Sequence, residues 1–452
     1  MLPARPGLGA ALLLAAAVWP LCARATAQEH GTKAHEQARL IPEKSHPDRL
    51  PERPSIPPST SIPVDPLGFA APGPIYLGQR HSLASLDFLD ESHLLFTFRV
   101  PGLIHRQHHG DDEDESEEHH VRAVVLALPS GAVEAESLWM LHDRGHYVWA
   151  LKDGRFLLRD GSELRLGDAS LDLKPYLRFP GPLLSMSMDP AQQLLVTDSR
   201  EPALSKAAAA NVADNNLADN KDPSPRTVAS QPEFVLRILH RDSGKVMVVN
   251  RIRSAVHLPL NSDGYLEMLP GNGSNWTIEL DSFDGSSKRL GEMESTCTPS
   301  EDFLSQQEFL ITTCTRYDLR AMFAMTTDGR TLWEDLPLSS PVWPLYLTSA
   351  DGSRMARESL AVTHPVTAFS PLSFDDVRGQ VVEVFDSASG KIELTAPANP
   401  VLDAGGNVAI SPSGRRVAIL NAGAIQVFDL PAPPPLPEPP SPAEASRIGP
   451  SK

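Results

Sequence analysis

The feature that most constrains the fold is a turn that recurs along the chain between short β-type runs. One form joins two such runs through Ser-Gly or Asp-Gly, and it occurs at 128–133, 240–246, 326–332 and 385–392. A second form follows a short apolar run, at 186–190, 347–352 and 410–419. Regular turns between short strands, with almost no stretch of helical periodicity, predict an all-β domain. Their repetition indicates that one structural unit recurs.

The two turns resemble the outer-hairpin and inner-strand turns of WD-repeat and YVTN-type β-propellers, although the Trp-Asp dipeptide and the YVTN string are both missing. The resemblance covers residues 76–430. Without two non-repetitive inserts at 101–120 and 201–232, seven units would hold about 43 residues each, against the roughly 40 to 45 of a propeller blade. The resemblance therefore implies an all-β propeller of seven four-stranded blades. A pair of β-sandwiches and an eight-bladed ring are the alternatives.

The N-terminus has the three parts of a secretory signal peptide. Arg5 supplies a positive charge, Leu8 to Val18 form an apolar run, and small residues precede a cleavage site after Ala27. The apolar run is shorter than the roughly 20 residues of a membrane helix, and no later segment approaches that length. With residues 1–27 as the signal, we expect a secreted or periplasmic protein without a membrane span after signal removal.

Two segments have compositions that do not support a packed core. Residues 28–75 are rich in Pro, Ser, Lys and Glu without apolar periodicity, and they are predicted to form a disordered linker. Residues 431–452 begin with a proline run and are predicted to form an exposed polyproline II tail. The propeller is therefore expected between these ends.

Cys297 and Cys314 are the cysteines that remain after signal removal, and each lies in a threonine-flanked β-type run. In an oxidising compartment such a pair is more often a disulfide than a metal or catalytic site. We predict that the two pair across one hairpin. Two free buried thiols are the alternative.

The formal net charge of -17 argues against a nucleic-acid partner, because phosphate binding needs clustered Lys and Arg. Many of the acids lie between Asp111 and Glu118, in the first insert. Imidazoles that suit Zn, Cu or Ni flank this run, at His105, His108, His109, His119 and His120. No ordered ligand spacing accompanies them. A specific metal site, weak capture of divalent ions and a solvated loop are the alternatives, and no cofactor is firmly implied.

Loop length indicates where the function lies. In a four-stranded blade, the connections from second to third strand open on the same face as those between blades. The long connections at 101–120, 200–232 and 362–378 all come after a second strand, so we expect them on one face. A blade-to-blade connection on that face carries a candidate binding set of Trp139, His142, Asp143, Arg144 and His146. Alternatively, Trp139 and Trp149 pack between blades and the polar residues cap the turn.

Motifs of common enzyme classes are missing from the chain: it has no Gly-x-Ser-x-Gly elbow, His-Glu-x-x-His, phosphate loop or Cys-x-x-Cys-His. Such absence is weak evidence, because propeller enzymes assemble their sites from distant blades. From the elaborated face we expect an exported binding or scaffold propeller that holds a protein or glycan partner on its long-loop face. The alternative is a propeller-type hydrolase or lyase with His, Asp and Arg groups near the central channel. Nothing in the sequence indicates the oligomeric state.

Overall fold

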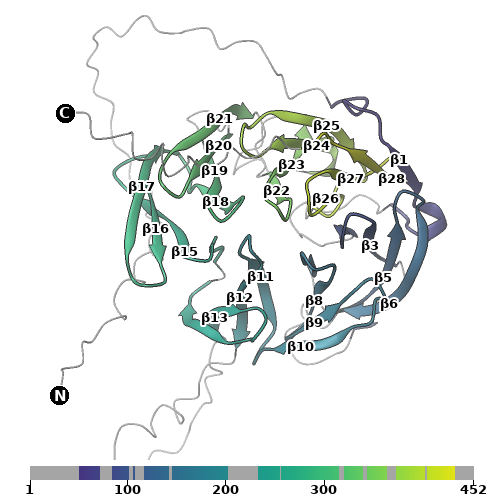
Figure 1. Ribbon diagram of the computed structural model, residues 1–452, viewed down its shortest axis with the longest axis horizontal. Helices are drawn as coiled ribbons and strands as arrows, with labels where there is room; N and C mark the ends of the chain where they lie inside the picture. The colour runs from purple at the N-terminus through teal and green to yellow at the C-terminus, as the bar shows by residue number, and fades with distance from the viewer. Residues whose placement is uncertain are drawn as a thin grey trace, which may run out of the picture.

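The protein is a ring of antiparallel sheets around a central axis (Figure 1). The computed structural model describes residues 50–71, 84–100, 105–106, 117–141, 145–201, 233–254, 256–314, 320–338, 344–363, 373–402 and 405–432. Within these ranges the only helices are two short 3-10 turns, η1 (Asp65–Leu67) and η2 (Phe374–Asp376), and no helix there is long and apolar enough to cross a membrane. Seven sheets make up the ring, which confirms the predicted seven-bladed propeller.

The blades follow one another in chain order, and each runs from an inner to an outer strand. Blade 1 consists of β2 (Ala84–Phe88), β3 (His93–Arg99), β5 (Glu117–Ala127) and β6 (Ala132–Leu141). Blade 2 consists of β7 (Val148–Ala150), β8 (Phe156–Asp160), β9 (Glu163–Gly167) and β10 (Lys174–Arg178). Blade 3 consists of β11 (Leu183–Met188), β12 (Leu194–Glu201), β13 (Glu233–His240) and β14 (Val246–Ile252). Blade 4 consists of β15 (Gly264–Pro270), β16 (Asn275–Ser282) and β17 (Ser287–Glu294). Blade 5 consists of β18 (Ser300–Phe303), β19 (Glu308–Cys314), β20 (Arg320–Thr326) and β21 (Thr331–Leu338). Blade 6 consists of β22 (Leu345–Thr348), β23 (Arg354–Val362), β24 (Val377–Asp386) and β25 (Ile392–Ala398).

Two blades depart from the four-stranded pattern. In blade 4 a single bridge between Leu260 and Tyr265 stands in the place of an inner strand. In blade 1 the short strand β4 (His105–Arg106) pairs with the start of β5. Because β5 begins at Glu117, the last four residues of the predicted insert at 101–120 belong to a strand.

Blade 7 is completed by a strand from the other end of the chain. Its β26 (Val408–Ile410), β27 (Arg416–Asn421) and β28 (Ala424–Asp429) come from the C-terminal part, and β1 (Thr60–Pro63) pairs antiparallel with β28 as the outer strand. This strand lies within the segment predicted to be a disordered linker, so that prediction is wrong for residues 60–63. Ile62 and Val64 are buried there against the neighbouring blades, which outweighs the proline-rich composition.

The core lies between neighbouring blades, because each blade buries both faces against the next. Leu94, Phe96 and Phe98 of β3 pack in one cluster with Leu420 and Val427 of blade 7. The inward-facing positions of β3 therefore lie against a neighbouring blade, as expected for the second strand of a blade. Burial of one large apolar side chain contributes roughly 1.5 to 3 kcal/mol, so these interfaces hold the ring together.

The recurrent turns occupy two equivalent positions. The Ser-Gly turns join the third and fourth strands of a blade, where Gly131 and Gly390 have φ angles of 71° and 67° that favour glycine. The second form joins the first and second strands. There Asp189 Oδ1 accepts the backbone N–H groups of Gln193 and Leu194, both at 2.6 Å.

Candidate functional site

Three second strands end on the same face of the ring. β3, β12 and β23 end at residues 99, 201 and 362, and the third strands of these blades begin at 117, 233 and 377. Because neighbouring antiparallel strands run in opposite directions, these connections and the blade-to-blade connections emerge on one face, which we call the long-loop face. The strand order confirms this expectation. Residues 107–116, 202–232 and 364–372 lie outside the described residues.

The connection from β6 to β7 reaches the long-loop face and carries the predicted binding set. His142, Asp143 and Arg144 lie outside the described residues. Trp139 is 6% exposed, and its ring centroid lies 5.8 Å from that of Phe156, so it packs between blades 1 and 2. The structure therefore leaves Trp139 in the core, as the alternative interpretation has it.

His146, the last member of that set, is exposed on the long-loop face. Its ring meets the Trp149 ring edge to face, with centroids 4.6 Å apart. The protein groups around the imidazole reduce its hydration, which disfavours the charged ring, and the positive charge of the Arg159 guanidinium acts in the same direction. Together they lower the pKa of His146 to about 4. The imidazole is therefore neutral at pH 7 and would contact a ligand by stacking or hydrogen bonding.

The histidines predicted to capture ions are described only in part. His105 lies opposite Glu118 in the pairing of β4 with β5, and His119 and His120 lie opposite residues of β6. His108 and His109 lie outside the described residues. Among the side chains that are described, no three or more His, Cys, Asp or Glu come together in a way that would hold a metal ion.

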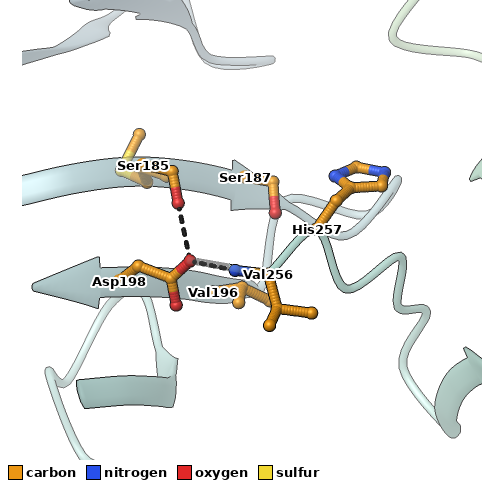
Figure 2. A pocket seen from close by; sticks show the side chains of 7 residues that line it. Ser185, Ser187, Val196, Asp198, Val256 and His257 are labelled. Carbon is orange, nitrogen blue, oxygen red and sulfur yellow. Dashed lines mark hydrogen bonds between the residues drawn. The ribbon is translucent and has the colours of Figure 1, made fainter. Parts of the chain in front are cut away.

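A cavity of about 180 Å³ lies near the long-loop face, between the inner strands of blade 3 and the connection from β14 to β15 (Figure 2). The residues that line it are Ser185, Met186, Ser187, Val196, Asp198, Val256 and His257. Ser185 lies opposite Asp198 in the β11–β12 register, and Ser187 lies opposite Val196, so all four occupy one face of the blade.

The mouth and the floor of the cavity differ in exposure. Ser185, Val256 and His257 are exposed and form its accessible side. Val196 and Asp198 are 3% and 0% exposed and form its buried side. The carboxyl group of Asp198 therefore lies behind the accessible wall of the cavity, out of contact with solvent.

Asp198 has one engaged and one unengaged oxygen. Its Oδ2 accepts hydrogen bonds from Ser185 Oγ and from the Val256 backbone N–H, each at 3.0 Å (Figure 2). Its Oδ1 is buried and accepts no hydrogen bond from any described residue. Burial raises the pKa of Asp198, against the opposing effect of these two hydrogen bonds. Asp198 is therefore a buried carboxyl group with one oxygen that the described residues leave unengaged.

His257 joins the cavity to the inner strand of blade 5. Its Nε2 lies 2.8 Å from Asp302 Oδ1 and 3.1 Å from the Glu301 carbonyl oxygen. The hydrogen bond with Asp302 raises the pKa of His257 to about 9, so the ring is charged at pH 7. Burial raises the pKa of Glu301 to about 7. The mouth thus carries a neutralised His–Asp pair beside a second acid.

None of the cavity residues was among the predicted site residues. Ser185, Asp198 and His257 are far apart in sequence, and only the closing of blade 3 brings them together. One local signal was present, because Asp198 interrupts the apolar strand that begins at Leu194.

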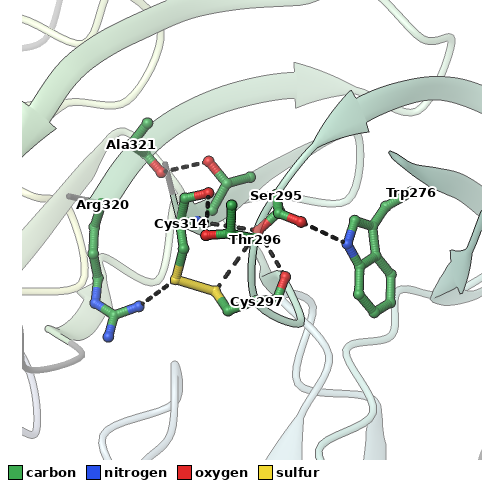
Figure 3. The surroundings of a disulfide bond; sticks show 8 residues. Trp276, Ser295, Thr296, Cys297, Cys314, Arg320 and Ala321 are labelled. Atoms are coloured by element: carbon green, nitrogen blue, oxygen red, sulfur yellow. Dashed lines mark hydrogen bonds between the residues drawn. A yellow bond between two sulfur atoms is a disulfide. The ribbon is translucent and has the colours of Figure 1, made fainter. Parts of the chain in front are cut away.

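A disulfide joins Cys297 to Cys314 on the same face, with the Cα atoms 5.5 Å apart (Figure 3). The predicted pairing is confirmed. Cys314 ends β19, whereas Cys297 lies in the connection from β17 to β18, three residues before the strand in which it was expected. The Thr296 backbone N–H donates to the Cys314 carbonyl at 2.9 Å, and the Cys314 N–H donates to Ser295 Oγ at 3.0 Å. The disulfide therefore fixes a blade-to-blade connection to blade 5.

Loss of this disulfide should destabilise the ring. For the sequence separation of 17, the loss of loop-closure entropy predicts that the Cys297→Ala/Cys314→Ala protein unfolds about 3 kcal/mol more easily than the parent. Denaturant titration of both proteins measures the difference, and reduction of the parent should reproduce it. Equal midpoints for the oxidised parent and the double variant would contradict the prediction.

No protein-family model and no curated protein matches the chain. Among solved structures it is similar to an acylaminoacyl peptidase of Pyrococcus horikoshii, with 8% identity, a TM-score of 0.42, and coverage of 79% of this chain and 53% of that one. The chain thus spans about half the length of the peptidase.

The chain is also similar to two isolated propeller domains. The C-terminal WD40 domain of Sif2 has 11% identity and a TM-score of 0.39, with coverage of 80% of this chain and 100% of that one. The β-propeller domain of the Trilobed protease from Pyrococcus furiosus has 10% identity and a TM-score of 0.40, with coverage of 77% and 94%. These likenesses are of fold alone, and the strand order defines the chain as a seven-bladed β-propeller.

Proposed function

We propose that the protein is an exported binding propeller that holds a protein or glycan partner on its long-loop face. The observation that carries this proposal is the strand order, which sends the connections after β3, β12 and β23 to one face. Extended connections on a rigid scaffold are common binding elements. The signal-peptide pattern supports export, and so does the disulfide, because disulfides persist in oxidising compartments.

The geometry of the cavity favours binding over hydrolysis or a lyase reaction. A serine hydrolase of the Ser–His type needs a hydroxyl group within hydrogen-bond reach of a histidine that accepts its proton. Ser185 Oγ donates instead to Asp198, and His257 Nε2 is engaged by Asp302 and Glu301. Within the described ranges, no hydrogen bond joins His257 to either serine of the cavity.

The test is affinity capture from the exported fraction, with two baits. One bait is the chain from residue 28, and the other has residues 103–119 replaced by a short turn. The replacement keeps the pairing of residues 93–99 with 121–127, so the melting temperature should change by less than about 5 °C. We expect the first bait to capture a partner that the second does not retain.

A third bait is the matched control. Lys245→Ala changes an exposed residue of the β13–β14 turn, on the face opposite the long-loop face, and should capture the partner as the parent does. Capture that survives the replacement of 103–119 but is lost in Lys245→Ala would place the binding surface on the wrong face and contradict the proposal.

A further inference from the structure

We propose that the disulfide on the long-loop face is a thiol-exchange site with a fixed direction. A small thiol attacks the sulfur of Cys297, and Cys314 leaves as a thiolate beside Arg320. The inference goes beyond the proposed function and does not rest on a partner. It is carried by an asymmetry between the two sulfur atoms, which differ in the charge next to them and in the exposure of their residues.

A positive charge lies next to one of the two sulfur atoms. The register of blade 5 places Arg320 of β20 directly opposite Cys314 of β19, so the two side chains lie on the same face of the sheet. Arg320 Nη1 donates to Cys314 Sγ at 2.9 Å (Figure 3). A neighbouring cation favours the thiolate of a cysteine over its thiol. The contact therefore becomes stronger when the disulfide breaks and negative charge develops on Cys314.

The sulfur of Cys297 lies beside a neutral group instead. Ser295 Oγ is 3.7 Å from Cys297 Sγ, and this hydroxyl group donates to the Cys297 carbonyl at 2.7 Å. A neutral hydroxyl group stabilises an anion less than a charged guanidinium does. Because the more stable thiolate leaves faster in thiol–disulfide exchange, Cys314 is the better leaving group. The incoming thiol therefore forms its bond to Cys297.

The exposure of the two cysteines favours the same direction. Cys297 is partly exposed in the connection from β17 to β18, and the residues on either side of it, Thr296 and Thr298, are exposed. Cys314 is 9% exposed at the end of β19. A thiol that arrives from solvent therefore meets Cys297 first.

The exchange is a two-electron reduction of the protein by two thiol molecules. The electron pair of the first thiolate forms a bond to Cys297 Sγ, and the pair of the broken disulfide bond stays on Cys314 Sγ. A second thiolate then attacks the sulfur of the small thiol in this mixed disulfide and releases Cys297 as a thiolate. The two small thiols leave as one disulfide, and water protonates the protein sulfur atoms.

Hydrogen bonds that do not involve sulfur hold the two cysteines together after cleavage. The Thr296 N–H donates to the Cys314 carbonyl at 2.9 Å, and the Cys314 N–H donates to Ser295 Oγ at 3.0 Å. Trp276 Nε1 donates to the Ser295 carbonyl at 3.1 Å (Figure 3). Because breaking the disulfide removes none of these groups, the Cys314 thiolate stays close to a mixed disulfide on Cys297 and can displace the small thiol. The exchange is therefore reversible.

The first experiment identifies the sulfur that is attacked. The oxidised chain from residue 28, which lacks Cys22, is treated with 2-mercaptoethanol, quenched at early times with N-ethylmaleimide and mapped by peptide mass spectrometry. We expect mercaptoethanol on Cys297 and maleimide on Cys314 in at least ten times the amount of the reverse pattern. A smaller excess, or an excess of the reverse pattern, would overturn the inference.

The second experiment measures the rate of reduction by 2-mercaptoethanol in 1 M salt, where the Debye length of about 3 Å screens the long-range attraction of the anionic thiolate. Arg320→Gln should be reduced at least about threefold more slowly than the parent, because the leaving thiolate loses its cation. Arg320→Lys keeps the charge and should recover part of the rate. Arg330→Gln is the matched control: Arg330 is an exposed arginine beyond the other end of β20, and its variant should keep the parent rate.

The sign of the effect separates this role from a structural one. An Arg320→Gln change that only loosened the packing would expose Cys314 and accelerate reduction. Acceleration, or slowing by less than about threefold, in the folded variant would therefore overturn the inference. If Arg320→Gln does not fold, the position of the mixed disulfide in the parent decides alone. Neither measurement involves a partner, so failure here leaves the proposed function standing.

Discussion

Replacement of Arg354 by methionine should lower the free energy of unfolding by about 3 to 5 kcal/mol, which is the usual effect of removing one partner from a buried ion pair. Arg354 begins β23 and is 0% exposed. Its Nε donates to Glu393 Oε2 at 2.5 Å, Nη1 to the Gly414 carbonyl at 3.0 Å and Nη2 to the Pro431 carbonyl at 2.6 Å. One side chain thus ties blade 6 to a turn of blade 7 and to Pro431, two residues after the end of β28.

The loss arises because methionine satisfies none of these acceptors. Arg354→Lys should recover only part of it, since an ammonium group lacks the planar fork that reaches three acceptors in different directions. Arg415→Met is the matched control: Arg415 is exposed on the same turn of blade 7, and the change should stay within about 0.5 kcal/mol. Denaturant titrations measure all three. A loss below about 1 kcal/mol for Arg354→Met would show that the buried arginine is not a link between the blades.

The blade pattern could be predicted from the sequence because it depends on local chemistry. The turns need Gly at positions such as 131 and 390, where φ is positive, and an acceptor such as Asp189 to bind the backbone of the turn. These requirements appear as residue types at fixed places between apolar runs. The number of blades and the face of the long connections follow from counting those places.

The closing strand could not be predicted in this way. β1 has four residues, two of them apolar or proline, and it lies in a proline-rich segment without alternation over a useful length. It is a strand because β28 offers it an edge and because the clusters of blades 7 and 1 bury Ile62. The partner strand β28 lies more than 350 residues after β1 in the chain, so no local pattern around β1 reveals the pairing.

The cavity was missed for a related reason. Asp198 lies in β12, and His257 lies in the connection from β14 to β15. In the sequence they appear as an isolated acid and an isolated histidine. The His-rich insert was conspicuous because its histidines and acids lie within one short segment of the sequence. Of the predicted binding set, His146 is accessible on the long-loop face, whereas Trp139 is used for packing.

The N-terminal segment does more than add one strand, because it crosses three blades. The Ser55 N–H donates to the Thr395 carbonyl of blade 6 at 2.8 Å, β1 pairs with β28 of blade 7, and the Leu67 carbonyl accepts a hydrogen bond from Arg122 Nη1 of blade 1 at 3.1 Å. Phe69 then packs edge to face on Phe96, with centroids 5.4 Å apart. The segment therefore holds together the two ends of the ring where they meet, and we call residues 55–69 the N-terminal strap.

Removal of this strap should have the largest effect of any change considered for this protein. A chain that begins at residue 72 loses the buried side chains of Ile62, Val64 and Phe69, which contribute roughly 1.5 to 3 kcal/mol each, and it exposes the edge of β28. The sum is of the order of the whole stability of a domain, typically 5 to 15 kcal/mol. We expect this chain to melt at least 10 °C lower than the chain from residue 28, or not to fold.

Two further proteins make the result interpretable. A chain that begins at residue 50 keeps the strap and should melt within about 2 °C of the chain from residue 28. Ile62→Ala leaves the backbone pairing intact and should cost about 2 to 5 kcal/mol, because it opens a cavity against blades 7 and 1. If the chains from residues 72 and 50 instead had the same melting temperature, blade-to-blade packing alone would close the ring. β1 would then contribute nothing measurable to the stability of the propeller.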